Sequence, residues 1–215
     1  MHRLVSKENL ASVLDSLEQE PELAVDTETT GLRWGDRLFA LQLAGEGREH
    51  YFDKRIIGDH WNNVVHFFSR PRTWTLQNAK FDLRMLRHDG IELRGRIEDL
   101  EVLARLDNNS HMSYSLENIS KRSGREKLID SIRAWVKANK GLGCTKHMLT
   151  WSEIEEDRWH LENCPNELMV PYGCADVRLT YDLKKEILSR LDERVIPVWE
   201  NEVKLTQKCF EMEWL

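Results

Sequence analysis

Apolar positions in the first half of the chain form short runs that glycine-containing turns separate. Ala24 and Val25 belong to a run that ends at Asp26, and three further runs have strand composition: 37–43, 50–52 and 73–76. Helical spacing of apolar residues is found at 61–68 and 80–88, and residues 98–106 have the pattern of a strand followed by a helix. This alternation of strands and helices predicts an α/β fold, with a mixed sheet flanked by helices.

The second half of the chain has a predominantly helical pattern. Residues 110–164 are polar and contain tryptophan, and the sequence Asn163-Cys164-Pro165-Asn166 interrupts them. A long helix is predicted from Leu168 to Leu191, with Pro171 tolerated because it lies near the helix start. We expect one domain at 1–193, with a helical, basic insert at about 121–163, followed by an amphipathic helix at 194–215.

The distribution of charge adds information that the net charge conceals. The chain carries a net charge of −6, which by itself disfavours a nucleic-acid partner. Between residues 121 and 150, eight lysine and arginine residues stand against two acidic ones, so this stretch carries +6 and the remainder −12. A local basic stretch on an acidic protein suits a nuclease with central carboxylates. A solvated helical hairpin with ordinary surface lysines explains it equally well.

Membrane and secretory signals are missing from the sequence. No apolar stretch is long enough to cross a bilayer, and the residues after Met1 lack the apolar region of a signal peptide. No C-x-x-C pair is formed by the cysteines, which we expect to be reduced thiols: Cys144, Cys164, Cys174 and Cys209. We therefore expect a cytoplasmic protein, in a bacterium or in the host cell if the source is a phage.

Two groups of residues in the helical insert suggest other chemistry. Two close pairs, twelve residues apart, have the spacing of a zinc site: Cys144, His147, His160 and Cys164. Their order is unusual and the β–turn–helix pattern of a zinc finger is missing, so structural zinc is a minor alternative. Three tryptophans could stack on bases, although helix packing is the commoner role: Trp135, Trp151 and Trp159.

Carboxylates at the ends of predicted elements are the main candidate site. Asp26 and Glu28 follow a buried run two residues apart, so their side chains project from the same side of a strand. Asp82 lies near the start of a helix, where a favourable interaction with the helix dipole is the alternative explanation. Tyr172 and Asp176 are four residues apart on the long helix and share one of its faces, although a surface pair has the same spacing.

Four such carboxylates suit the hydrolysis of a phosphodiester. The reaction needs an activated water, a neutralised transition state and a stabilised leaving alkoxide, and two divalent ions about 4 Å apart supply all three. Mg²⁺ and Mn²⁺ prefer oxygen ligands, so Asp and Glu rather than Cys or His build such a site. The sequence predicts a nuclease that uses two Mg²⁺ or Mn²⁺ ions.

The same motifs resemble those of a known family. VDTETTGL at 25–32, NAKFD at 78–82 and YGCAD at 172–176 are similar to the exonuclease motifs of the DEDDy-class proofreading domains of family A DNA polymerases. The resemblance covers about residues 1–193, and Pro171 stands where the related DEDDh class has histidine. It implies a ribonuclease-H-like fold and the release of nucleoside 5′-monophosphates from a 3′ end.

The resemblance also implies a role for each residue of the site. Asp26, Glu28 and Asp176 would hold the ion that activates water, while Asp26 bridges to a second ion that Asp82 supports. Tyr172 would orient the attacking water. The implied substrate contacts, for which ordinary turn packing is the alternative, are Thr29, Leu32 and Asn78.

The expected function is hydrolysis of single-stranded DNA 3′ ends in proofreading, with a polymerase domain or subunit as partner. Residues 211–215 resemble the entry into such a domain, and its absence would leave part of the last helix exposed: Val195, Val198, Trp199, Val203 and Phe210. A ribonuclease-D-like RNA exonuclease and an inactive exonuclease-like scaffold are the alternatives. The sequence leaves the oligomeric state open.

Overall fold

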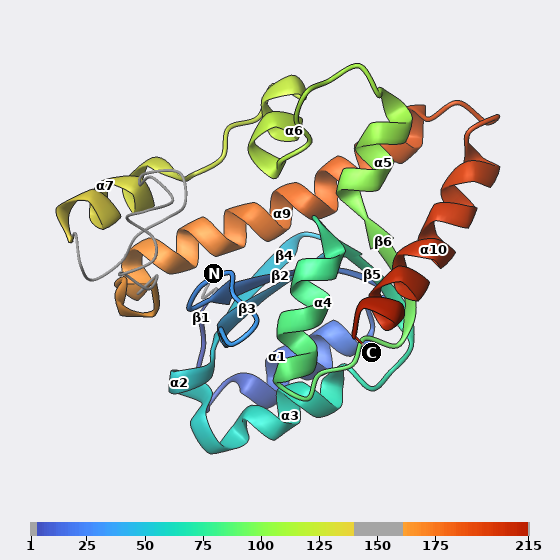
Figure 1. The fold of residues 1–215 in the computed structure, drawn as a ribbon. Helices are drawn as coiled ribbons and strands as arrows, with labels where there is room; N and C mark the ends of the chain where they lie inside the picture. Colours follow the sequence, from blue (N-terminus) through green and yellow to red (C-terminus); the bar gives the residue numbers. More distant parts are fainter. Residues whose placement is uncertain (1–3, 140–160, 215) are drawn as a thin grey trace.

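A mixed β-sheet lies at the centre of the computed structural model, which describes residues 4–139 and 161–214 (Figure 1). In this part of the chain six strands pair in the order β1-β4-β3-β2-β5-β6. Their bounds are β1 Leu4–Val5, β2 Glu22–Thr29, β3 Leu38–Gly45, β4 Arg48–Asp53, β5 Arg72–Leu76 and β6 Gly95–Asp99. β2, β3 and β4 form an antiparallel meander, whereas β5 and β6 extend it in parallel beside β2, and β1 pairs in parallel with β4. The predicted α/β fold with a mixed sheet is confirmed.

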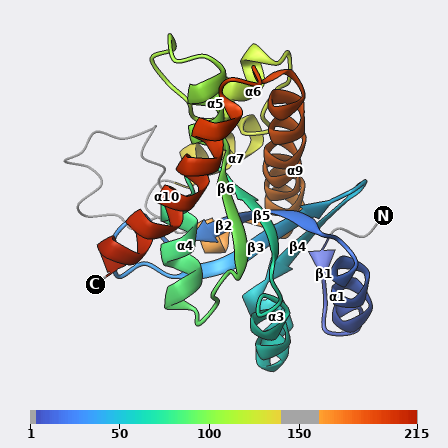
Figure 2. The same ribbon diagram turned by 90° about the vertical axis from the view of Figure 1, so that its right-hand side faces the viewer.

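Helices cover both faces of the sheet (Figures 1 and 2). One face packs against α1 Leu10–Glu18, α3 Trp61–Phe67 and α4 Ala79–His88. The other face is crossed by the long helix α9 Asn166–Arg190, which packs against three shorter helices: α5 Leu100–Asp107, α6 Leu116–Arg122 and α7 Asp130–Ala138. Short helical turns complete the connections: α2 Lys54–Ile57, η1 Gly58–His60 and η2 Leu161–Asn163.

Strand β2 shows how the sequence pattern positions the candidate site. Because both faces of the sheet are covered, the apolar residues Leu23, Ala24 and Val25 follow one another without alternating with polar ones, and the polar half of the strand begins at Asp26. Ala24 packs toward α9, against Val177 and Tyr181, while Val25 belongs to the core on the α1 and α4 side. Since side chains alternate along a strand, Asp26 shares the α9 face with Ala24.

The last helix, α10 Ile196–Trp214, packs along β6 and against α4 and α5 (Figure 2). The expectation that its apolar face is partly exposed is wrong for Trp199 and Val203, which are 2% and 6% exposed in a core shared with α5, α6 and α9. Phe210 is half-buried against the core beside α4, and Val198 is exposed as expected. The helix therefore buries Trp199 and Val203 within this chain, while Val198, Leu205 and Met212 remain exposed.

The remaining predictions concern the N-terminal segment, the cysteine and histidine pairs, and the tryptophans. The pattern predicts no element before Leu23, whereas β1 and α1 lie there. Cys144, His147 and His160 lie outside the described residues, as do Trp151 and Trp159. Cys164 is a buried free thiol. Trp135 of α7 is half-buried against a hydrophobic cluster, which favours a packing role for its ring. Among the described helices, none is long and apolar enough to span a membrane.

Candidate active site

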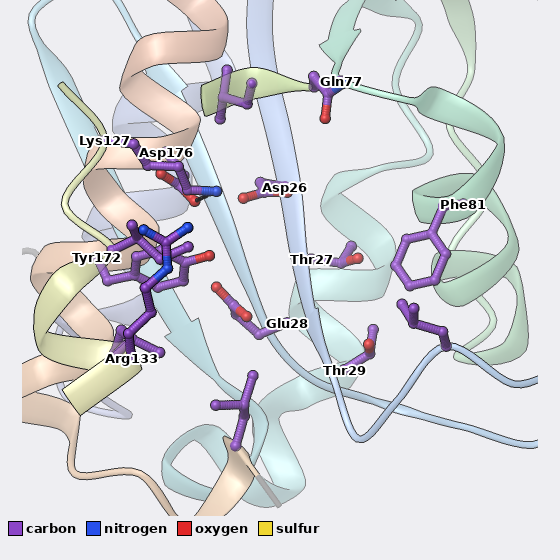
Figure 3. A pocket seen from close by; sticks show the side chains of 15 residues that line it. Asp26, Thr27, Glu28, Thr29, Gln77, Phe81, Lys127, Arg133, Tyr172 and Asp176 are labelled. Atoms are coloured by element: carbon purple, nitrogen blue, oxygen red, sulfur yellow. Dashed lines mark ion pairs between the residues drawn. The ribbon is translucent and has the colours of Figure 1, made fainter. Parts of the chain in front are cut away.

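A cavity of about 220 Å³ lies at the carboxyl end of β2, on the face that α9 covers. Asp26 and Glu28 line it from the strand, and Tyr172 and Asp176 line it from the helix. In Figure 3 the two strand carboxylates point toward these helix residues. Residues as far apart in the sequence as Asp26 and Asp176 thus share one cavity.

The end of β2 changes direction directly after the second carboxylate. Glu28 pairs with Ala40 of β3, but Thr29 pairs with Leu38, so the register shifts between the two residues. Such a bulge bends the strand and changes the direction of the side chains that follow. The Thr29 hydroxyl donates a hydrogen bond to the Gly31 carbonyl at 2.7 Å, and Thr29 lines the cavity with Leu32.

Gly173 allows α9 to approach the sheet closely enough to bring its two site residues over β2. A Cβ atom at this position would lie 2.9 Å from Gln42 Cδ and 3.0 Å from Tyr51 Cε2. Gln42 is fully buried and is the β3 partner of Asp26. The glycine therefore fixes the separation between the helix and the strand that carry the acids.

Asp82 is close to the other carboxylates but does not line the cavity. Thr27 points away from α9, and its hydroxyl donates a hydrogen bond to Asp82 Oδ1 at 2.5 Å. Helix α4, which carries Asp82, begins after Asn78, whose φ of 60° is in the left-handed region. The Asp99 carboxylate accepts hydrogen bonds from the backbone N–H groups of Asn78 and Ala79, so it caps the helix and holds its start in place.

The three implied substrate residues have different positions. Thr29 is buried, Leu32 is 42% exposed, and both line the cavity. The Asn78 side chain is exposed, and Gln77 rather than Asn78 is among the residues that line the cavity. Phe81 lines the cavity from α4, opposite Tyr172 (Figure 3).

Lys127 is a site residue that sequence reasoning missed. Its Nζ lies 2.7 Å from Asp176 Oδ2 and 5.3 Å from the centre of the Tyr172 ring, and its side chain is only 15% exposed. The sequence placed this lysine within the basic stretch, but no spacing pattern connected it with the acids. Other basic side chains of the stretch pair with acids outside it: Arg125 with Glu186, and Lys121 and Arg133 with Glu117.

Burial and mutual repulsion change the acidity of the carboxylates. Burial, followed by the charge of Asp176, raises the pKa of Asp26 to about 7. Burial and Asp26 also raise the pKa of Glu28 and of Asp82 well above the usual values. Burial raises the pKa of Asp176 as well, although Lys127 partly offsets this effect. These acids therefore favour any cation that could neutralise them.

The donor set fits a hard divalent cation. It consists of carboxylate oxygens, which Mg²⁺ and Mn²⁺ prefer, and Asp176 Oδ1 is buried with no hydrogen-bond partner. Within the described residues, no three His, Cys, Asp or Glu side chains are grouped closely enough to hold one ion. A shared ion would therefore require the carboxylates to move closer together.

The mixed sheet and the acids at the end of its central strand define a ribonuclease-H-like fold. The chain belongs to the exonuclease family of DNA polymerase A type, whose profile is described as "3′–5′ exonuclease" and matches residues 2–192. The family predicted from the three motifs is confirmed.

Curated relatives include phage DNA polymerases. The chain is 29% identical over 212 residues to DNA polymerase DpoZ of Salmonella phage PMBT28, a match that covers 94% of this chain and 32% of the relative. It is 25% identical to DNA polymerase DpoZ of Acinetobacter phage SH-Ab 15497, covering 92% of this chain and 31% of the relative. The chain therefore spans about a third of the length of these relatives.

Solved structures share the fold at low sequence identity. RNase D of Trypanosoma brucei has a TM-score of 0.71 at 16% identity, covering 97% of this chain and 71% of that one. Escherichia coli RNase D has a TM-score of 0.66 at 20% identity, covering 98% and 50%. Brucella melitensis NrnC with bound Mg²⁺ has a TM-score of 0.56 at 20% identity, covering 90% and 82%.

Proposed function

We propose that this chain is a metal-dependent exonuclease that removes nucleotides from the 3′ end of single-stranded DNA. The observation that carries the proposal is the shared cavity of Asp26, Glu28, Tyr172 and Asp176, with Asp82 bonded to the adjacent Thr27. Membership of the 3′–5′ exonuclease family supports the same activity.

The side chains divide the work according to their chemistry. When bound, two Mg²⁺ or Mn²⁺ ions would activate the water and neutralise charge on the reacting phosphate. Asp26, Glu28 and Asp176 would hold one ion, while Asp26 and Asp82 would serve the second. Burial and Asp176 raise the pKa of Tyr172 well above its usual value, so its hydroxyl stays protonated and can orient the attacking water.

Thr29 and Leu32 are proposed to hold the terminal nucleotide, because both line the cavity beside the acids. Asn78 keeps only the role of a phosphate contact at the cavity rim, since its side chain is exposed outside the lining. Lys127 joins the proposed site as a cation that balances the charge of Asp176.

DNA is favoured over RNA as substrate because the curated relatives are named as DNA polymerases. We propose that the chain is the proofreading part of such an enzyme and acts in the cytoplasm beside a polymerase domain or subunit. The RNase D structures share the fold at 20% identity or less, so they do not argue for RNA.

Matched DNA and RNA oligonucleotides with a 5′ label test the proposal. With Mg²⁺, the DNA should shorten stepwise from its 3′ end and release nucleoside 5′-monophosphates, and Asp26→Ala should serve as the inactive control. Faster shortening of the RNA would replace DNA by RNA as substrate. No shortening of either strand would favour the inactive scaffold.

A further inference from the structure

A second hollow lies beside the cavity of the acids, and Phe81 lines both. It has a volume of about 320 Å³, and its walls come from the loop after β2, from α4 and from the end of α10: Trp34, Lys80, Phe81, Arg84, Phe210 and Glu213. A single strand of DNA whose 3′-terminal nucleotide is bound beside the acids would pass over Phe81 to reach this hollow.

The loop that carries Trp34 is closed by its own hydrogen bonds. The backbone N–H of Thr30 donates to the Arg37 carbonyl at 2.9 Å, and the backbone N–H of Arg37 donates to the Thr30 hydroxyl at 3.0 Å. The buried Asp36 carboxylate accepts from the backbone N–H of Arg33 at 2.6 Å. The loop therefore presents its apolar side chains in a defined position.

Arg84 joins this loop to α4. It donates a hydrogen bond to the Leu32 carbonyl at 3.0 Å, and its guanidinium lies 5.8 Å from the centre of the Trp34 ring and 5.3 Å from that of Phe81. The Trp34 ring also meets His88 edge-on, at 5.2 Å between ring centres. Despite these contacts Trp34 remains 55% exposed, so a large part of the indole ring can be reached by a ligand.

Two cations, Lys80 and Arg84, and one acid, Glu213, line the hollow with the exposed ring. Lys80 reaches the hollow from α4, where Glu213 accepts a hydrogen bond from it at 2.6 Å. Burial lowers the pKa of His88, and the charges of Arg37 and Arg84 lower it further. Two cations therefore lie near the His88 ring, which contacts Trp34. An aromatic face with cations at its rim has the chemistry that single-stranded nucleic acids bind, by base stacking and phosphate attraction.

We propose that Trp34 stacks on the base of the nucleotide that precedes the 3′-terminal one, with Lys80 and Arg84 close to the adjoining phosphates. The inference rests on the proposed exonuclease function and adds a binding subsite to it. It also adds cations outside residues 121–150, the basic stretch that the charge count identified. The loop and α4 provide a second basic region that is not contiguous in the sequence.

Binding of an oligothymidylate of about eight nucleotides, in chelator so that nothing is cut, tests the subsite. Trp34→Ala should raise its Kd about tenfold, the loss of one stacked base, whereas Trp34→Phe should retain most of the affinity. The affinity for thymidine 5′-monophosphate, measured by competition, should be the same in Trp34→Ala as in wild-type protein, because a single nucleotide does not reach Trp34. The exposed Met112 lies outside the lining of both cavities, so Met112→Ala is the matched control for loss of a surface apolar group.

An abasic nucleotide in the penultimate position sharpens the test. It should weaken binding by wild-type protein and add nothing further in Trp34→Ala, because both changes remove the same contact. The subsite would be overturned if Trp34→Ala bound the octamer with an unchanged Kd, or if the abasic nucleotide weakened binding equally in both proteins. Either result would favour a protein partner at the Trp34 ring. If wild-type protein cuts DNA normally in that case, the proposed function stands without the subsite. Wild-type protein that neither binds nor cuts any strand would overturn both.

Discussion

The two halves of helix α9 differ in how their polar groups are satisfied. In the first half, up to Asp176, burial raises the pKa of both Tyr172 and Asp176, and Asp176 Oδ1 has no hydrogen-bond partner. Beneath Gly173, the side-chain amide of Gln42 and the hydroxyl of Tyr51 are also buried without partners. This half carries several buried polar groups that stability alone would eliminate.

In the second half, buried and half-buried charges are paired. Lys184 lies 2.9 Å from Glu22 and 2.8 Å from Glu98, so it joins the helix to β2 and β6. Arg178 contacts Glu49 of β4 at 3.2 Å. Apolar residues of this half also form a common core with α5, α6 and α10.

The difference indicates a division of labour along one helix. The half beyond Asp176 fixes the position of α9 on the sheet. In the half up to Asp176, Lys127 pairs with Asp176 Oδ2, but Asp176 Oδ1 and the polar atoms beneath Gly173 stay available for ligands. Because both halves belong to one rigid element, stability supplied at one end can hold an unfavourable arrangement at the other. Substitutions in the two halves should therefore separate activity from stability.

Asp176→Ala should produce the largest change, a loss of turnover of about 10³-fold or more with the fold retained. Tyr172→Phe should reduce turnover less, by about 10- to 100-fold, because the hydroxyl positions water and carries no metal charge. Titration calorimetry with Mn²⁺ should show weaker binding in the first variant only. Equal losses of metal affinity in both would move Tyr172 into the group of metal ligands.

Lys184→Met should chiefly affect stability. Removing this buried ammonium leaves Glu22 and Glu98 without it, which should lower the free energy of unfolding by about 3 kcal/mol. The neighbouring Lys185, which pairs with the exposed Glu46, provides the control, and Lys185→Met should change stability little. Urea unfolding measures both, and turnover of the folded Lys184→Met protein should stay close to normal.

Lys127→Met is the counterpart at the other end of the helix. It should also destabilise the protein in chelator, because it removes the cation beside Asp176. Mn²⁺ should restore stability to this variant, since a divalent ion neutralises the same carboxylates, but it should not rescue Lys184→Met. Equal rescue of both variants would mean that the two halves do not differ in this respect.

The sequence predicted those parts of the site that depend on local pattern. Asp26 and Glu28 could be placed on one face because strand alternation requires it, and helical spacing did the same for Tyr172 and Asp176. Lys127 could not be placed, because its contact depends on how the segment between α6 and α7 crosses the cavity. No periodicity in the sequence encodes that path.

Tertiary packing also decided features that charge and amphipathicity left open. Trp199 and Val203 looked available to a polymerase partner, but β6 and α5 lie close enough to bury them within the chain. Trp34 gave no signal in the sequence, because the loop that presents it depends on Asp36 and on the distant Arg84. The acids could therefore be predicted from local sequence patterns, whereas the residues around them depend on contacts between elements that are distant in the sequence.

The stability of the protein should depend on pH when metal is removed, because Asp26 of β2 is buried beside the first half of α9. The pKa of Asp26 is raised to about 7, above its unfolded value of about 3.9, so the folded state binds the proton more tightly. The resulting stability is fully present below about pH 4 and is lost as the pH rises through about 7. Asp26→Asn cannot ionise, so in chelator its free energy of unfolding should exceed that of wild type by about 4 kcal/mol more at pH 8 than at pH 4, since each of about three pKa units is worth about 1.4 kcal/mol. Urea unfolding at both pH values checks this, and a constant difference would contradict the raised pKa.

Gly173→Ala should produce the smallest change in stability and tests the geometry that connects the helix to the sheet. Alanine favours a helix over glycine by about 1 kcal/mol, so propensity alone predicts stabilisation. The added Cβ would lie within 3.0 Å of the buried side chains of Gln42 and Tyr51, and overpacking of this kind costs about 1–3 kcal/mol. We expect a net loss of about 1 kcal/mol in urea unfolding, with a several-fold fall in turnover because Tyr172 and Asp176 move away from β2.

Ala175→Gly, two residues further along α9, is the matched control for helix propensity. It should lose about 1 kcal/mol through propensity, with turnover less affected than in Gly173→Ala. If Gly173→Ala instead gained about what Ala175→Gly loses, the helix would have room to accept a methyl group at this point. The close approach of α9 to Gln42 would then not set the position of the acids, and the contrast between the two halves would rest on charge alone.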